Sequence, residues 1–500
     1  MKNVEELIAR SRDRGIKLWV SEGVLRYRAP RAAISTELRA ELQANKVSII
    51  DALSGPRYEY APEVLEVEIP EPFAALWGQV QTGIIGTGYT NVTNMLCRFK
   101  CPINVEALEQ ALTWMVQRHN ALRCRLSDDE RGMRLVFDRT PKLVSMDLSD
   151  CDASEVESVL TKAAQEIFWK PFSSDECLFK PFMFKLPSSE LAIGFVVHHF
   201  IVDAWSFALI PRYWMQGYAM QLGEHPEGAK PQEYLQCSDY LRGVANWSKT
   251  LNFRRRLGYW KEALGGAVPS RLPPDLLVEP DQRSFHRAQH IQIAFERVEQ
   301  LSVLAASIEV TLSDVILAGV VIALQSELNA SDICVRHAWH GRDESKLVDM
   351  IGFPADMVFL RVRLNTASCL PEVARQIHRV ALDAVENYVP SYYIDKLLTE
   401  AGATAFVQTN FQFRDDLGDH TREVRAASSF VKGIRVPELH RPFTTPRKLQ
   451  AHDINLSLVD GSVWGDVVYL ESVYDDETIS RFIQRFHEAL EVPIAAREYA

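Results

Sequence analysis

The most informative stretch of this chain, for both fold and function, is Val196-Val197-His198-His199-Phe200-Ile201-Val202-Asp203-Ala204-Trp205-Ser206. The residues just before it, from Leu191, carry no polar side chain and are typical of a buried strand. Neighbouring side chains on a strand point to opposite faces, so only one of the two histidines can face a given cavity. A turn after the strand can bring Asp203 back toward the pair. Because an imidazole in a carboxylate network is suited to proton transfer near neutral pH, the stretch predicts an acid–base site.

Composition and charge restrict the classes of function. A chain of 500 residues predicts two or three domains, and 47% hydrophobic with 24% charged residues is ordinary for a globular protein. The net charge of −11 argues against nucleic acid as the main ligand. The longest apolar run, Val315 to Leu324, is too short to span a bilayer, and the N-terminus lacks the apolar core of a signal peptide. We therefore expect a cytoplasmic protein without a membrane partner.

Cysteine and histidine spacing gives no sign of a metal. No Cys/His set in the chain has convincing zinc spacing. We expect no bound metal ion.

The first 55 residues are predicted to form a separate small unit. The apolar pattern and the turn residues indicate a helix, two short strands and two more helices, the strands near 16–20 and 24–27 and the later helices near 36–44 and 46–53. The unit has ten Lys/Arg and seven Asp/Glu, a net charge of +3. Residues 56–69 are rich in Pro and Glu and predict a linker. From residue 70 onward, strand-like runs alternate with amphipathic helices, which indicates an α/β (α+β) fold.

The histidine stretch resembles the His-His-x-x-x-Asp-Gly motif of condensation domains in nonribosomal peptide synthetases, members of the chloramphenicol acetyltransferase superfamily. Three later segments are similar to further motifs of these domains: His340-Gly341-Arg342, Gly352-x-x-x-Asp356-x-x-x-x-Arg361 and Thr409-Asn410-Phe411. The resemblance implies a two-lobed, chloramphenicol acetyltransferase-like pseudo-dimer with residues 70–245 in the first lobe and 246–500 in the second. A tunnel would run between the lobes past His199.

The same resemblance implies roles for single residues. The catalytic motif consists of His198, His199 and Asp203; within it His199 would orient the nucleophile and take or relay its proton, and His198 would be structural. Arg342 would form a salt bridge with Asp203 and order the site, together with Trp205 and Ser206. Three residues would lie along the tunnel, namely Gly352, Asp356 and Asn410. For Asn410 a plain hydrogen bond at a turn or at a strand edge is an equal alternative.

The N-terminal unit resembles the docking domains of some synthetase subunits, of the kind seen in tubulysin assembly. The segments Gly15–Trp19 and Leu25–Pro30 carry this resemblance. It implies an αββαα fold that binds the C-terminal tail of an upstream subunit by adding a strand to the hairpin. The residues expected to bind it are Leu18, Trp19, Leu25, Arg26 and Arg28. A positive unit suits a tail with acidic residues, although a solvated charged surface explains the charge equally.

The implied reaction is the formation of an amide. Donor and acceptor carrier proteins would deliver thioesters on 4'-phosphopantetheine arms, and the acceptor amine would attack the donor carbonyl. The chain itself would bind no cofactor. A free-standing acyltransferase with a soluble acceptor and a non-catalytic recruiting module remain alternatives. An epimerisation domain shares the motif but would follow a carrier domain, and a heterocyclisation domain would have Asp in place of the first histidine.

Three residues depart from the expected pattern. Position 204 is Ala where Gly is usual, and Ala would be costly if the backbone needed positive φ or a close approach. Position 356 is Asp where Asn is usual. Pro211 is expected to kink or delay the helix that follows Trp205.

Overall fold

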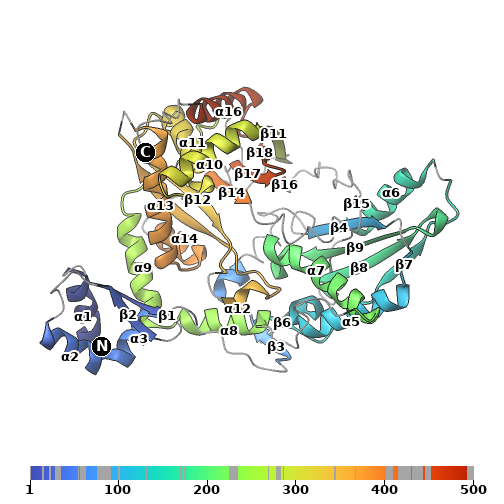
Figure 1. Cartoon of the computed structure of the whole chain (residues 1–500), viewed down its shortest axis with the longest axis horizontal. Coiled ribbons are helices and arrows are strands. Elements are labelled where there is room, and N and C mark those ends of the chain that lie inside the picture. Colours follow the sequence, from blue (N-terminus) through green and yellow to red (C-terminus); the bar gives the residue numbers. More distant parts are fainter. Residues whose placement is uncertain are drawn as a thin grey trace.

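The computed structural model of the chain describes residues 2–13, 16–21, 24–28, 35–54, 56, 64–75, 92–99, 102–130, 132–152, 154–168, 170, 172–173, 176–224, 235–268, 270–276, 283–284, 286–342, 345–365, 368–400, 409–414, 429–430, 443–444 and 452–491. Figure 1 shows a small N-terminal unit and two larger lobes that lie side by side.

The N-terminal unit has the predicted order of elements. It consists of α1 (Lys2–Asp13), β1 (Lys17–Ser21), β2 (Val24–Arg28), α2 (Thr36–Ala44) and α3 (Lys46–Leu53). The antiparallel strands form a hairpin, and apolar side chains from the helices close a small core under it. Its buried members are Leu7, Ile8, Ile16, Leu38, Leu42 and Ile49. The αββαα fold predicted for this unit is confirmed.

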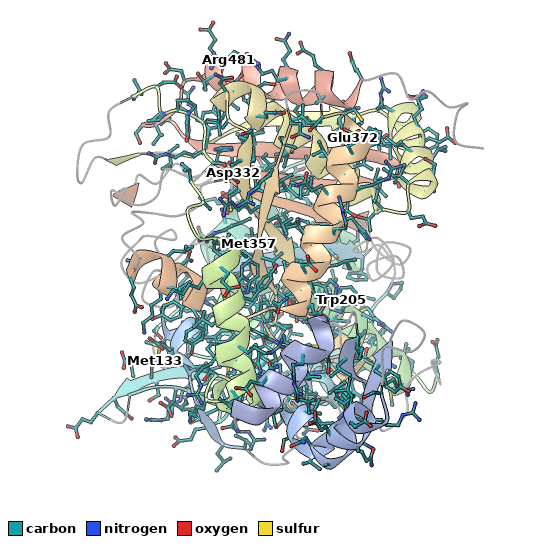
Figure 2. The ribbon with its side chains drawn as sticks, turned by 90° about the vertical axis from the view of Figure 1, so that its left-hand side faces the viewer. Met133, Trp205, Asp332, Met357, Glu372 and Arg481 are labelled. Carbon is teal, nitrogen blue, oxygen red and sulfur yellow. The ribbon has the colours of Figure 1, made fainter. Side chains whose placement is uncertain are left out.

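The N-terminal unit is attached to the rest of the chain through α9 (Leu251–Ala263). The buried side chain of Asn252 on α9 donates a hydrogen bond through Nδ2 to the carbonyl of Ala52 on α3. In Figure 2 the blue unit lies at the foot of this green helix. A buried amide needs a hydrogen-bond partner, so this bond favours one placement of the unit against α9.

The first lobe is built on a five-stranded sheet in the order β15-β4-β9-β8-β7. Helices α5 and α7 cover one face of this sheet and α6 covers the other. The bounds of these elements are β4 (Val92–Phe99), α5 (Val105–Arg118), β7 (Val144–Asp147), α6 (Val156–Phe168), β8 (Phe179–Lys185), β9 (Leu191–His198), α7 (Ala204–Gln221) and β15 (Ser429–Phe430). Every residue of β9 is buried because the strand is central and both its faces are covered. This explains its unbroken apolar sequence.

The linker prediction was too long at its C-terminal end. Residues Glu66–Glu68 form β3, which pairs with β6 (Gly132–Val136), itself paired with β5 (Arg125–Asp129). Val67 and Ile69 are buried in the first-lobe core, so this segment belongs to the folded lobe. Alternation of Glu with Val and Ile is the strand signal that the Pro- and Glu-rich composition concealed.

The second lobe has a six-stranded mixed sheet in the order β11-β18-β17-β14-β12-β13. Its strands are β11 (His286–Ile293), β12 (Asp332–Trp339), β13 (Asp356–Arg363), β14 (Thr409–Arg414), β17 (His452–Val459) and β18 (Ser462–Leu470). The helices of this lobe are α10 (Phe295–Ser307), α11 (Leu312–Leu328), α13 (Leu370–Glu386), α14 (Ser391–Glu400) and α16 (Asp476–Leu490). A separate two-stranded pair joins β10 (Arg283–Ser284) and β16 (Phe443–Thr444).

The lobes exchange segments rather than meeting at a flat boundary. Along the chain, core membership changes within α8 (Cys237–Trp247), since Val244 packs in the first core and Trp247 in the second. Strand β15, far along the chain, pairs with β4 of the first lobe. The second-lobe part of the chain also contributes α12 (Ser345–Val348) and the residues after it to the first lobe. Leu347, Met350 and Ile351 of this segment are buried in the first-lobe core. These crossings fix the lobes at the seam where β9 ends.

Helix α7 corrects the expectation for Pro211. The helix begins at Ala204 and continues through the buried proline, so its start is not delayed. A proline inside a helix forfeits one backbone hydrogen bond. Burial of its neighbours Leu209, Ile210, Tyr213 and Trp214 offsets that loss.

Among the described helices, no single one is long and apolar enough to cross a bilayer; α10 and α11 reach that length only together, across a bend of 105°.

Candidate functional site

The two histidines at the end of β9 have opposite environments. His198 ends the strand and is 3% exposed, and its Nδ1 accepts a hydrogen bond of 3.1 Å from the backbone N–H of Phe200. Burial, together with the neighbouring His199, lowers the pKa of His198 from 6.5 to about 4. A neutral ring that accepts a backbone N–H is a structural cap of the following 3-10 turn (His199–Ile201).

His199 is the exposed member of the pair. Among the described residues, neither of its ring nitrogens makes a hydrogen bond. Its ring instead contacts Phe353 of the second lobe, edge to face, with the ring centroids 5.1 Å apart. Its nitrogens are therefore available to a substrate at the seam of the lobes.

Asp203 orders this turn without touching the imidazoles. Its carboxylate, 2% exposed, caps α7 by accepting the N–H of Ser206 at 2.7 Å, and it accepts two hydrogen bonds of 3.0 and 3.1 Å from Nη2 of Arg342. The sequence suggested a carboxylate that holds a histidine, but the hydrogen bonds of Asp203 go to the helix start and to the second lobe. Asp203 is therefore connected to His199 only through the backbone of the turn between them.

Arg342 is the cation of this buried network, and the structure pairs it with Asp203 as the resemblance implies. Its Nη1 donates to the carbonyls of Leu347 and Met350, the latter at 2.9 Å, and Nη2 also donates to Oγ of Ser206 at 2.7 Å. A planar guanidinium can satisfy a carboxylate, a hydroxyl and two carbonyls at once, which a lysine cannot.

Gly341 allows the backbone next to Arg342 to pack closely against Pro354. Its φ is +68°, and a Cβ there would lie 2.1 Å from the carbonyl oxygen of Pro354. Only glycine fits such a position. The next N–H, that of Arg342, donates to Nδ1 of His340 at 3.0 Å.

Ser206 and Trp205 tie α7 to the second-lobe segment around residue 350. Oγ of Ser206 donates to the carbonyl of Gly352 at 2.7 Å and accepts its N–H at 3.0 Å. Nε1 of Trp205 donates to the carbonyl of Val348 at 2.9 Å, and its indole stacks on His340. Figure 2 shows Trp205 beyond the end of the β12–β13 pair that carries Met357. Gly352 thus acts through its backbone, and its nearest obstacle to a Cβ is only the flexible end of Met350.

The usual glycine at position 204 is not required here. Ala204 is the first residue of α7, and the described residues with positive φ do not include it. The alanine therefore causes no backbone strain, and its methyl group only adds volume at the start of the helix.

Asp356 is held by four hydrogen bonds at the start of β13. Its carboxylate accepts from the N–H of Met357, from both the N–H and the hydroxyl of Ser391, and from the hydroxyl of Tyr388, at 2.6 to 3.0 Å. Burial raises the pKa of Asp356. Four converging donors suit a carboxylate, which only accepts, better than the amide of Asn. The residue anchors α14 to β13, and a place along a tunnel remains a prediction.

Asn410 lies in a polar group on the second-lobe sheet that the sequence did not reveal. Its Nδ2 donates to Asp453 at 2.6 Å, and its register partner on β12 is Arg336, which pairs with Asp395 of α14. Burial raises the pKa of Asp395 to about 6. The side chain of Asn410 thus bonds to the neighbouring strand β17, but β14 lies between β17 and β12, so this is not a bond at a sheet edge. The tunnel role is again a prediction. Long-range pairings of this kind leave no local sequence signal.

A second contact missed by sequence reasoning joins Tyr213 and Asp349. The tyrosine hydroxyl donates to Oδ1 of Asp349 at 3.0 Å. Tyr213 follows Ser206 by two helical turns on the same face of α7, and that spacing was the available signal.

The residues predicted to bind a docking partner lie on the hairpin of the N-terminal unit. Leu18 and Leu25 pack partly against its core, and Arg26 is exposed. The side chains of Trp19 and Arg28 lie outside the described part of the structure. Within that part, the β1–β2 pair bonds to no third strand, so each strand has an outer edge open to a partner.

The described residues contain no group of three or more His, Cys, Asp or Glu side chains that could hold a metal ion. What the side chains of the site offer is an exposed imidazole for proton transfer, on a turn fixed by a buried ion pair.

Two lobes joined at a His-His-x-x-x-Asp turn define a protein of the chloramphenicol acetyltransferase-like class. The chain belongs to the condensation-domain family. The family described as "Condensation domain" matches residues 87–497, and the "TubC N-terminal docking domain" matches residues 4–54.

Several proteins of nonribosomal peptide synthesis are similar to this chain. One of the linear gramicidin synthase proteins of Brevibacillus parabrevis is 23% identical over 449 residues, which is 87% of this chain and 9% of that protein. The chain thus spans a tenth or less of the length of such relatives. Among solved structures, the EpoB cyclization-docking bidomain from Sorangium cellulosum has a TM-score of 0.68 at 17% identity and covers 98% of this chain and 99% of its own. A condensation domain of the enacyloxin polyketide synthase gives 0.70 at 15% identity, covering 98% and 96%. At these identities the structures show the fold alone.

Proposed function

We propose that this chain forms an amide bond between two carrier-bound substrates, with His199 as the residue that handles the proton. The observation that supports this most is the exposed imidazole of His199 at the seam of the lobes, with ring nitrogens that bond to no described residue, on a turn fixed by the buried pair of Asp203 and Arg342. Similarity to a linear gramicidin synthase favours a peptide product. The cytoplasm is the expected location.

The proposed step is the aminolysis of a thioester. The acceptor amine attacks the donor carbonyl, an N–C bond forms, the C–S bond breaks, and the amine proton passes by way of His199 to the leaving thiolate. A free α-amine has a pKa near ~8, so much of it is already neutral. Alignment of the two phosphopantetheine arms at the seam therefore supplies much of the rate, and His199 orients the amine as well as relaying its proton.

The N-terminal unit is proposed to bind the tail of an upstream subunit by strand addition. The open edges of the β1–β2 hairpin, with Arg26 and Tyr27 exposed on β2, favour an extended acidic segment.

Charge reversal on the hairpin tests the docking proposal. Arg26→Glu is expected to weaken binding of a synthetic acidic peptide about fivefold at low salt, and less at high salt. The matched control is Arg39→Glu, because Arg39 is an exposed arginine of the same unit on α2. Equal losses in both variants, by titration calorimetry, would point to net charge instead of the hairpin.

Intact-protein mass spectrometry tests the condensation proposal. Donor and acceptor carrier proteins, loaded through their phosphopantetheine arms, are incubated with wild type and with His199→Ala. Gain of the donor's acyl mass by the acceptor carrier, with wild type only, is the expected result. Product on a soluble amine or alcohol would favour a free-standing acyltransferase. No product at all, with peptide binding by the hairpin retained, would favour a recruiting module.

A further inference from the structure

The imidazole of His199 lacks the support that its neighbour has. His198 is fixed by burial and by the N–H of Phe200, whereas His199 is exposed and no described residue bonds to its ring nitrogens. A side chain that must present one nitrogen to a reacting amine gains nothing from free rotation, since each misaligned rotamer lowers the fraction of productive encounters. Some contact other than a hydrogen bond has to orient this ring.

The ring of Phe353 supplies such a contact. Its centroid lies 5.1 Å from that of His199 with the planes at 60°, within the range of favourable edge-to-face aromatic pairs. Phe353 is half-buried and belongs to the second lobe, whereas His199 belongs to the first. The contact therefore exists only while the two lobes are joined at the seam.

Phe353 is itself fixed on both sides along the chain. The residue before it, Gly352, accepts the N–H of Asp203 at 3.1 Å and exchanges two hydrogen bonds with Ser206. The residue after it, Pro354, is buried, with its carbonyl packed against Gly341. The backbone at position 353 is thus fixed by the same network that buries the ion pair of Arg342.

We infer that Phe353 is a positioning residue that orients the imidazole of His199 across the lobe seam. The inference rests on the proposed condensation and adds to it a path from the buried ion pair to the reacting group. Arg342 and Asp203 hold Ser206, Ser206 holds Gly352, and Gly352 places the Phe353 ring against His199. An ion pair that touches neither imidazole can in this way govern the orientation of one.

The test compares Phe353→Ala with Phe353→Tyr, which keeps the ring. For Phe353→Ala, kcat for carrier-to-carrier condensation is expected to fall 10- to 100-fold with little change in KM. For Phe353→Tyr, kcat should stay within about threefold of wild type. The control is Phe413→Ala, because Phe413 is a half-buried phenylalanine packed on the second-lobe core. That variant should leave kcat nearly unchanged.

A readout independent of turnover separates this inference from the proposed function. In protein labelled with ¹³C at histidine Cε1, the His199 resonance is assigned by its loss in His199→Ala. Phe353→Ala is expected to shift this resonance by removing the ring current, while Phe413→Ala leaves it in place. Unchanged His199 signals and unchanged kcat in Phe353→Ala would overturn the inference. A shifted His199 resonance in Phe353→Ala, with a wild-type protein that condenses no carrier-bound pair, would support the contact and refute the proposed function.

Discussion

The surroundings of His198 and His199 differ sharply, although the two residues are adjacent in the chain. On one face His198 is sealed in the first-lobe core between aromatic rings, with its pKa lowered to about 4. On the other, His199 opens onto the seam of the lobes against a ring of the second lobe. Burial keeps His198 neutral, because desolvation disfavours the charged imidazolium, whereas His199 remains accessible to solvent and substrate.

The largest expected effect comes from substituting the two histidines one at a time. His199→Ala should lower the condensation rate about 10²- to 10⁴-fold and leave the free energy of unfolding within about 0.5 kcal/mol, because the residue is exposed. His198→Asn keeps an acceptor for the N–H of Phe200 and should retain most activity. Rates and urea denaturation of both variants check this. A greater loss of rate in His198→Asn would reverse the assignment.

The buried network that holds the turn after the two histidines can be broken at Arg342. Arg342→Leu leaves the carboxylate of Asp203 buried without its cation and should cost about 3 to 5 kcal/mol of unfolding free energy. Adding Asp203→Asn to this variant removes the unpaired charge and should recover part of that loss. Arg297→Leu, at a half-buried arginine of α10 whose Nη1 donates to the exposed side chain of Gln300, is the control and should change stability by less than about 0.5 kcal/mol. A full loss with no recovery in the double variant would mean that packing, and not charge, is what Arg342 provides.

The pH dependence of stability should separate the two environments. The folded protein keeps His198 neutral down to a pH of about 4, whereas the unfolded chain binds that proton near 6.5. The stabilisation is therefore complete above pH 6.5 and is lost as the pH falls from 6.5 toward 4, at about 1.4 kcal/mol per pH unit. His198→Asn should show a correspondingly shallower decline between pH 6.5 and 4.5 by denaturant titration. An identical slope would assign the decline to the other histidines whose pKa is lowered by desolvation, which are His119, His337, His452 and His487.

The smallest effect is expected at Asp356, a half-buried carboxylate whose four hydrogen-bond donors are all uncharged. Asp356→Asn removes the cost of burying a charge but leaves fewer acceptors for those donors, so the two changes oppose each other. We expect a net change within about 1 kcal/mol, measured by denaturation. A loss as large as that of Arg342→Leu would show that α14 depends on the charge of residue 356.

The sequence indicated the elements and the family because both depend on local pattern. The apolar run into His198, the alternation along the hairpin and the spacing of Asp203 after His199 were all readable in one dimension. The overall composition of residues 56–69 led to a wrong prediction at β3. Its Glu-Val-Glu alternation is a strand pattern, but the Pro- and Glu-rich content of the whole segment indicated a linker. Pro211 misled in the opposite sense, because a local penalty was outweighed by burial of the residues around it.

What the sequence determined by itself was the family and the groups to which its motifs assign the chemistry: two histidines, one aspartate and an arginine. What only the tertiary structure decided was how they are joined. The structure gave a physical basis to the roles expected of His199, His198 and Arg342, by exposing the first, burying the second and pairing the third with Asp203. It alone showed that Asp203 also caps a helix and that Phe353 of the other lobe contacts the exposed ring. The physical reason is that solvent exclusion and contacts between residues more than a hundred positions apart arise only from packing, which no local pattern encodes.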